Sequence, residues 1–302
     1  MPFRGFAHSP DAESVEIARF DGVHAPPAWA TPAWLEANRS ELRAGVALDT
    51  ETTGLDAARD RVIEVAVLPF TFDRRTGEVV AVEAPYTALQ DPGFPLSPEV
   101  TRITGLTDDD LRGQQIDVAR VRALLAAASV VVAHNAGFDR PFVEALVAGA
   151  PGPAGEPMWG CSLQQIDWSA KGMPSAGLEV LCVFHGFFTR NHRAGPDTAA
   201  LLHLLALRDD DTGRPYLDEM LRAMRVRTGL VRAVGAPFEA KDALKQRRYR
   251  WDAARRVWQK EIPRDDWSAE QAWLADEVYR GRGRAEFEEL RWQDRYRAPQ
   301  GV

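Results

Sequence analysis

The stretch from Val46 to Leu55, Val-Ala-Leu-Asp-Thr-Glu-Thr-Thr-Gly-Leu, constrains this chain most, because it joins an apolar run to a pair of carboxylates. Successive side chains of a strand point to opposite faces, so Asp49 and Glu51 share a face and can reach one ion. Proteins hold Mg²⁺ through one or two carboxylates together with substrate phosphate oxygens. The stretch therefore predicts part of a divalent-metal site, although a solvated strand end before a Thr-Gly turn would also explain these residues.

Composition narrows the class of protein. The chain has 302 residues, enough for one large domain and a small appendage, and its 45% hydrophobic and 27% charged content is typical of soluble globular proteins. The net charge of −7 argues against non-specific coating of nucleic acid, but allows a local basic surface. The two cysteines lack metal-ligand spacing, and neither a secretion signal nor a membrane span is present, so we expect a cytoplasmic protein without membrane contact.

The order of elements predicts an α/β or α+β sheet covered by helices. Strands at Val46 and over 61–68 and 78–82, with a turn at 73–77, indicate an antiparallel meander, and 129–133 indicates a buried strand. Helical spacing or capping patterns predict helices after Ser97 and Thr107 and over 118–128, 140–147, 176–185, 198–208 and around 217–224.

Two further segments carry chemistry-bearing side chains. In Ala133-His-Asn-Ala-Gly-Phe-Asp139 we expect the carboxylate to lie in a turn between a strand and a helix opened by Pro141. In His192-Arg-Ala-Gly-Pro-Asp197 we expect Asp197 at a helix start, with His192 on the preceding loop because Gly195-Pro196 intervenes. A histidine beside a carboxylate-bound metal is what activation of a water requires.

These three segments, in this order, resemble the exonuclease motifs of the DEDDh family. The chain is therefore similar to DnaQ-like 3′→5′ exonucleases over roughly residues 44 to 210. The stretches Thr52-Thr53-Gly54-Leu55, Ile63-Glu64-Val65-Ala66 and Ile103-Thr104-Gly105-Leu106-Thr107 agree as well.

The resemblance implies a ribonuclease-H-like mixed sheet flanked by helices, with four carboxylates converging on two divalent ions, Mg²⁺ or Mn²⁺. By that similarity Asp49 bridges the ions, Glu51 and Asp197 help to hold one, and Asp139 holds the other. His192 takes the proton from the attacking water, a role suited to a side chain whose ordinary pKa is about 6.5.

The resemblance also implies contacts to the terminal nucleotide. Thr52 and Thr53 offer backbone or hydroxyl groups beside Gly54, and Leu55 wedges against the base. His134, Asn135 and Phe138 belong to the same candidate substrate-binding set, although Phe138 is equally well explained as core and His134 as a structural hydrogen-bonding residue. Met158-Trp-Gly-Cys-Ser162 stands where family members often have an Asp-Thr pair, so this stretch departs from the family pattern of substrate contacts.

The chain is expected to divide into an irregular leader (1–40), an exonuclease domain (41–232) and a small basic and aromatic α+β domain (233–302). From Lys241 to Lys260 the composition turns basic, and a hairpin about 252–255 precedes a helix capped by Ser268. Candidate nucleic-acid contacts are Arg247, Arg248 and Arg250, with the interleaved aromatics stacking on bases. In the other interpretation the aromatics are the core of the domain and the charges its solvated face. We favour aromatics in the core, with the basic strip still contributing to binding.

The sequence therefore predicts a metal-dependent exonuclease that releases nucleoside 5′-monophosphates from single-stranded or frayed 3′ ends of DNA. An exoribonuclease of the same family is the alternative within the enzyme class, since nothing visible reads the 2′-hydroxyl. A non-catalytic scaffold that holds nucleic acid or a polymerase is the alternative from another class. A polymerase or a repair protein is a candidate partner.

Overall fold

The computed structural model describes residues 17–20, 22, 24–150, 156–189, 193–253, 255–281 and 283–297. The chain forms two compact units, which we describe separately: Met1–Met224 together with Tyr296–Ala298, and Arg225–Arg295 together with Pro299–Val302. The second unit thus begins at Arg225, before the expected boundary at 232. In the described part of the chain, no helix is both long and apolar enough to cross a bilayer.

The first unit is built on a mixed six-stranded sheet of order β4-β3-β2-β6-β7, with β5 also paired to β3. The predicted meander is confirmed, because β2, β3 and β4 pair antiparallel, whereas β6 and β7 continue in parallel. The strands β5 and β7 were not predicted. The bounds are β2 Leu42–Thr52, β3 Val62–Asp73, β4 Val79–Val82, β5 Tyr86–Leu89, β6 Val130–Ala133 and β7 Met158–Cys161.

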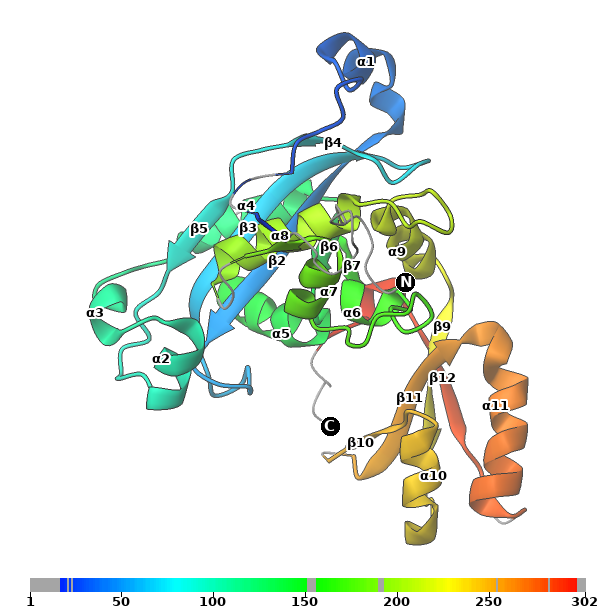
Figure 1. The fold of residues 1–302 in the computed structure, drawn as a ribbon. Coiled ribbons are helices and arrows are strands. Elements are labelled where there is room, and N and C mark those ends of the chain that lie inside the picture. Colours follow the sequence, from blue (N-terminus) through cyan, green and yellow to red (C-terminus); the bar gives the residue numbers. More distant parts are fainter. Residues whose placement is uncertain are drawn as a thin grey trace, which may run out of the picture. The chain divides into compact units, whose positions relative to one another are not determined.

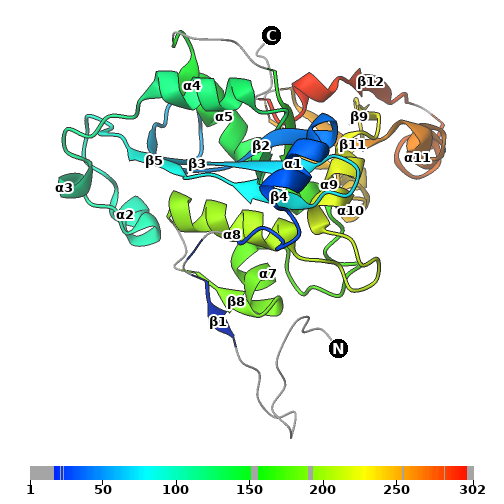
Figure 2. The same cartoon turned by 90° about the horizontal axis from the view of Figure 1, so that it is seen from above.

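Helices cover both faces of this sheet, with α4 and α5 on one side and α7 and α8 on the other (Figure 2). Apolar side chains of β2 alternate accordingly: Leu48 packs with the α4 and α5 side, and Ala47 with the α7, α8 and α9 side. The bounds are α2 Pro98–Thr104, α3 Asp108–Leu111, α4 Val118–Ala127, α5 Ala136–Val147, α6 Ser162–Gln165, α7 Leu178–Phe184, α8 Ala194–Ala206 and α9 Tyr216–Met224.

Two helices begin earlier in the sequence than predicted, so that each includes a proline that was expected at or before its start. The helix α5 begins at Ala136 and contains Pro141, so Asp139 lies in its first turn rather than in the loop before it. The helix α8 begins at Ala194, so Gly195-Pro196 belongs to its first turn. The first four N–H groups of a helix have no partner within it, so Pro196, which lacks an N–H group, costs no helical hydrogen bond in the first turn. Burial of Ala136, Phe142 and Val143 stabilises α5 despite Pro141.

The cap predictions for α2 and α3 are confirmed. Ser97 accepts a hydrogen bond from the backbone N–H of Val100, and Thr107 and Asp110 form a reciprocal capping box. Two elements precede the sheet in the sequence (Figure 1). The strand β1 (Ala18–Arg19) pairs with β8 (Phe187–Phe188), and the helix α1 (Pro32–Ala37) has Thr31 as its N-cap.

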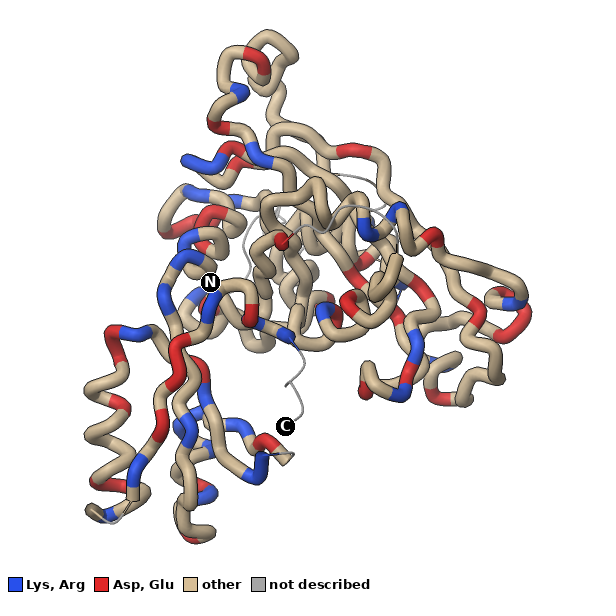
Figure 3. The backbone as a smooth tube through the Cα atoms, turned by 180° about the vertical axis from the view of Figure 1, so that it is seen from behind, with Lys and Arg blue, Asp and Glu red and all other residues tan. Residues whose placement is uncertain are grey.

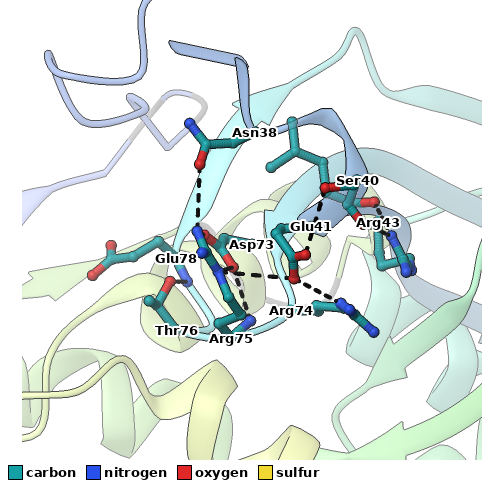
Figure 4. Close-up of polar contacts among 10 residues, drawn as sticks. Asn38, Ser40, Glu41, Arg43, Asp73, Arg74, Arg75, Thr76 and Glu78 are labelled. Atoms are coloured by element: carbon teal, nitrogen blue, oxygen red, sulfur yellow. Dashed lines mark hydrogen bonds and ion pairs between the residues drawn. The ribbon is translucent and has the colours of Figure 1, made fainter. Parts of the chain in front are cut away.

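Charged side chains join the start of β2 to the end of β3 (Figure 4). The Arg75 guanidinium binds both carboxylate oxygens of Asp73, at 3.2 Å from Nε to Oδ1 and 2.9 Å from Nη2 to Oδ2, and Arg74 Nε lies 3.0 Å from Glu41 Oε2. Because Leu42 pairs with Asp73 at this end of the two strands, the network fastens the sheet at the end remote from Asp49 and Glu51.

The second unit is a four-stranded antiparallel sheet of order β10-β11-β9-β12. The predicted hairpin exists as β10 and β11, but α11 starts at Trp267 after Asp266, so Ser268 lies inside the helix and is not its cap. The bounds are β9 Thr228–Ala233, α10 Lys241–Gln246, β10 Arg250–Asp252, β11 Val257–Pro263, α11 Trp267–Trp273 and β12 Glu286–Leu290; a π-helical turn (Leu274–Tyr279) extends α11.

Candidate metal centre and substrate site

Three carboxylates from two elements converge on the face of the sheet covered by α8. Asp49 and Glu51 are two residues apart on β2, so their side chains point to the same face of the sheet. Asp197 comes from the first turn of α8. One ligand atom from each of the three lies within 4.8 Å of the others. Two oxygens bound to one Mg²⁺ can be at most about 4.2 Å apart, so a small side-chain rotation brings all three onto one ion.

The fourth predicted carboxylate, Asp139, reaches the same region from α5 and is 2% exposed. Its Oδ1 accepts hydrogen bonds from the backbone N–H of Thr50 at 3.1 Å and from the Thr50 hydroxyl at 2.9 Å. Asp139 is thereby fixed to the residue between Asp49 and Glu51. The prediction did not include Thr50, whose only sequence signal was its position between two carboxylates.

Burial and mutual repulsion raise the pKa values of these groups. Desolvation, then the charges of Asp139, Asp197, Glu51 and Glu64, hold the pKa of Asp49 well above its usual range. Desolvation also raises the pKa of Glu51 to about 8, while Arg193 acts in the opposite direction. The pKa of Asp139 rises to about 7 through desolvation, against the opposing hydrogen bonds from Thr50. Buried carboxylates that retain protons near neutral pH are a donor set that a hard divalent cation would stabilise.

The predicted general base, His192, lies outside the described residues. The chain is described again from Arg193, which directly precedes α8. We therefore keep the role of His192 as a proposal that depends on the sequence motif.

The segment after β2 holds the predicted nucleotide contacts. The Thr52 hydroxyl donates to the carbonyl of Gly54 at 2.6 Å, and the Thr53 hydroxyl lies 3.3 Å from Asp60 Oδ1. A Cβ at Gly54 would lie 2.5 Å from the Asp60 carboxylate, so a larger residue there would have to displace the Asp60 side chain. Leu55 is 87% exposed, so its apolar side chain is accessible to a ligand.

The residues around the start of α5 have mixed environments. Asn135 caps α5 in a left-handed conformation with a φ of 83°. His134 Nδ1 lies 2.7 Å from the Ser162 hydroxyl, and burial lowers the pKa of His134 to about 4. Phe138 packs on Phe142 with ring centroids 5.0 Å apart and is half-buried.

The three candidate arginines of the second unit also differ. Arg247 Nε binds both oxygens of the buried Glu270 at 3.0 and 3.1 Å, and its guanidinium lies over the Trp273 ring. Arg248 and Arg250 are exposed. Trp251 is 49% exposed and packs edge-on against Trp258. The stretch from α10 through β11 shows basic positions in close succession (Figure 3).

Comparison with known proteins decides the family. The sequence profile of RNase_T, described as Exonuclease, matches residues 46–205, more than half of the chain. The chain belongs to this exonuclease family. The resemblance to DnaQ-like 3′→5′ exonucleases and the expected ribonuclease-H-like α/β fold are thereby confirmed.

Individual relatives match only part of this chain. The chain is 37% identical over 101 residues to DNA polymerase III subunit epsilon of Treponema pallidum, covering 33% of this chain and 44% of that protein. It is 32% identical over 187 residues to the PolC-type DNA polymerase III of Bacillus subtilis, covering 58% and 12%. The structure of E. coli exonuclease I with single-stranded DNA aligns with a TM-score of 0.49 and 20% identity, over 64% of this chain and 48% of that one. The chain spans less than half of each of these proteins.

The raised pKa values predict how the metal-free exonuclease responds to pH. The Glu51 pKa is about 8 in the folded state against 4.5 ordinarily, so the folded form holds a proton that the unfolded form releases. The resulting stability is complete below about pH 4.5 and is lost as the pH rises through about 8. In EDTA, Tm should therefore fall by several degrees between pH 5.5 and 8.5, and added Mn²⁺ should raise Tm more at pH 8.5.

Circular dichroism melts of the wild type and Glu51→Gln check this prediction, because the variant should lose much of the pH dependence. A Mn²⁺-induced shift in Tm that is equal at both pH values, and unchanged in the variant, would contradict it.

Proposed function

We propose that the protein is a divalent-metal-dependent DEDDh exonuclease that removes nucleoside 5′-monophosphates from 3′ ends of DNA. The observation that carries the proposal is the convergence of Asp49, Glu51 and Asp197 within 4.8 Å, with Asp139 fixed beside them through Thr50. Retention of all four carboxylates argues against a scaffold without catalysis. DNA is favoured over RNA because the relatives are named as DNA polymerase III subunit epsilon and PolC-type DNA polymerase III, which also favours association with a polymerase.

The four carboxylates would hold two divalent ions, Mg²⁺ or Mn²⁺. When bound, such a pair supplies the positive charge that stabilises the attacking and leaving oxygens of an in-line phosphoryl displacement. His192 accepts the proton of the attacking water. Thr52 and Thr53 present backbone and hydroxyl groups to the terminal nucleotide, and the exposed Leu55 packs against its base.

Matched DNA and RNA oligonucleotides of one sequence, with products identified by mass spectrometry, test the proposal. We expect 5′-monophosphates from the DNA strand, with a higher kcat/KM than from RNA. Preferential degradation of RNA would establish the exoribonuclease alternative. Absence of hydrolysis on both strands, with binding retained, would favour the scaffold.

We also propose that Arg248 and Arg250 contact substrate phosphates. Arg247 is already paired with the buried Glu270, so reversing its charge would disturb the core of the unit. Deleting the unit would be a poor test, because Tyr296 packs into the core of the first unit and Arg297 Nε lies 3.1 Å from Glu144 Oε1. Charge reversal at the two exposed arginines avoids both problems.

The double variant Arg248→Glu/Arg250→Glu should raise KM for long single strands and leave dinucleotide hydrolysis unchanged. Loss of two phosphate contacts should reduce the slope of log binding constant against log salt by about 1.4. Arg280→Glu/Arg284→Glu is the matched control, because both residues are exposed in the same unit and the charge change is equal. If the two double variants had the same effect, the effect would reflect the net charge of the protein alone. Arg248 and Arg250 would then not be substrate contacts.

A further inference from the structure

Glu64 is a buried carboxylate beside the metal centre that the proposed chemistry does not use. It lies on β3, directly opposite Glu51 of β2, and is 1% exposed. Like charges opposite each other in an antiparallel pair repel, and a buried carboxylate is costly unless it is paired and hydrogen-bonded. Its placement therefore requires a specific compensating contact.

That contact comes from the start of α8. Arg193 donates to both oxygens of Glu64, from Nε to Oε2 at 2.9 Å and from Nη2 to Oε1 at 3.0 Å. The backbone N–H of Ala194 donates to Glu64 Oε2 at 3.1 Å. Ala194 is the first residue of α8, where backbone N–H groups lack helical partners and the helix dipole favours a negative charge. Glu64 thus caps α8 from a neighbouring strand.

The fastened end of α8 carries the third carboxylate of the cluster. Asp197 lies in the first turn, and its backbone N–H donates to the carbonyl of Arg193 at 3.1 Å. Asp49 and Glu51 lie on β2, whose pairing with β3 sets Glu51 opposite Glu64. The fork of hydrogen bonds therefore joins the start of α8, which supplies Asp197, to β3. The strand β3 is in turn paired with β2, which supplies Asp49 and Glu51.

We infer that Glu64 and Arg193 are a positioning pair that sets the place of Asp197 relative to Asp49 and Glu51, and thereby the affinity of the cluster for a divalent ion. The inference rests on the proposed metal centre. Arg193 also contributes a positive charge near Glu51, which offsets part of the repulsion among the carboxylates. Neither residue is assigned contact with the reacting atoms.

The test is calorimetric titration of the full-length chain with Mn²⁺, without nucleic acid, for Glu64→Gln, Arg193→Gln and Arg193→Lys. Residues that orient metal ligands typically contribute about 10- to 100-fold in metal affinity. We expect Glu64→Gln and Arg193→Gln each to weaken Mn²⁺ binding at least about tenfold, and the double variant to be little weaker than either, because the two side chains act as one unit. Arg193→Lys, which retains the charge but not the fork, should recover part of the affinity. Arg193 is partly exposed, so Arg193→Gln can be used to test the inference if Glu64→Gln does not fold.

Asp73→Asn is the matched control. Asp73 is also a buried β3 carboxylate held by an arginine fork, but it lies at the other end of the strand (Figure 4). It should lower Tm and leave Mn²⁺ affinity unchanged. Wild-type Mn²⁺ affinity in folded Glu64→Gln and Arg193→Gln, with Tm lowered as in Asp73→Asn, would overturn the inference and leave the pair with a role in stability. Wild-type Mn²⁺ binding that is unaffected by Asp49→Asn would instead overturn the metal centre itself, and this inference with it.

Discussion

Asp49→Asn should lower kcat by about 10³-fold or more, because several kcal/mol of charge stabilisation would depend on the carboxylate that we propose as a ligand of the metal ions. The same substitution should raise Tm in EDTA at pH 8. The Asp49 carboxylate is desolvated and faces Asp139, Asp197 and Glu51, and all of these raise its pKa. At pH 8 the folded state must either hold a proton that the unfolded state releases or bear the repulsion, and a neutral amide removes that cost. Activity and stability should therefore move in opposite directions.

Kinetics with saturating Mg²⁺ and melts in EDTA measure the two effects on the same preparation. Asp73→Asn, far from the cluster along β3, should lower Tm and retain kcat. Wild-type turnover in Asp49→Asn would remove this residue from the catalytic site. A fall in both kcat and Tm would point to damage to the fold.

His192→Ala should lower kcat by about 10² to 10⁴-fold with little change in DNA binding, as is typical when a general base is removed. The acidic limb of the rate profile should flatten, since an imidazole with an ordinary pKa of about 6.5 loses its basic form as the pH falls. Measurement at saturating Mg²⁺ keeps carboxylate protonation from contributing. Added imidazole should restore part of the rate.

His192→Gln is the control for side-chain volume, because it fills similar space without an equivalent base. Both His192 variants should lose the acidic limb of the pH–rate profile to the same extent. An unchanged rate and pH profile would return His192 to a structural role, and the proton acceptor would then have to be sought among other groups near the carboxylate cluster.

Local patterns carried much of the fold prediction. The two-residue period of β2 places Asp49 and Glu51 on one face, as the structure confirms. The capping box of Thr107 and Asp110 depends on neighbours three residues apart. The apolar face of α9, with Leu217, Met220, Leu221 and Met224 all buried, follows from helical spacing. Each of these features is decided within one element, so the sequence alone predicts it.

Features decided by distant contacts escaped prediction. Glu64 was visible only as part of a strand motif, because its partner Arg193 is 129 positions away. Pro141 was read as the start of a helix, since the buried face that sustains α5 from Ala136 depends on the sheet beneath it. The strand β7 contains Gly160, whose Cβ position would lie 2.8 Å from the sulfur of Met224, so its packing depends on α9.

The second unit shows the same division between local and distant information. Its hairpin and its aromatic core were predicted in outline. The different environments of Arg247 and Arg250 were not predicted. The sequence does not show that Glu270 on α11 pairs with Arg247, or that Arg250 is exposed.

The central claim is that this carboxylate cluster directs stepwise hydrolysis from a 3′ end. A time course on a 5′-labelled single strand of DNA, run in Mg²⁺, then in excess EDTA, then with Mg²⁺ restored, measures this directly. We predict a ladder that shortens one nucleotide at a time with release of 5′-monophosphates, stops in EDTA and resumes with Mg²⁺, and is absent for Asp49→Asn. Hydrolysis that continues after exhaustive EDTA treatment, or that cuts the strand internally, would contradict the account.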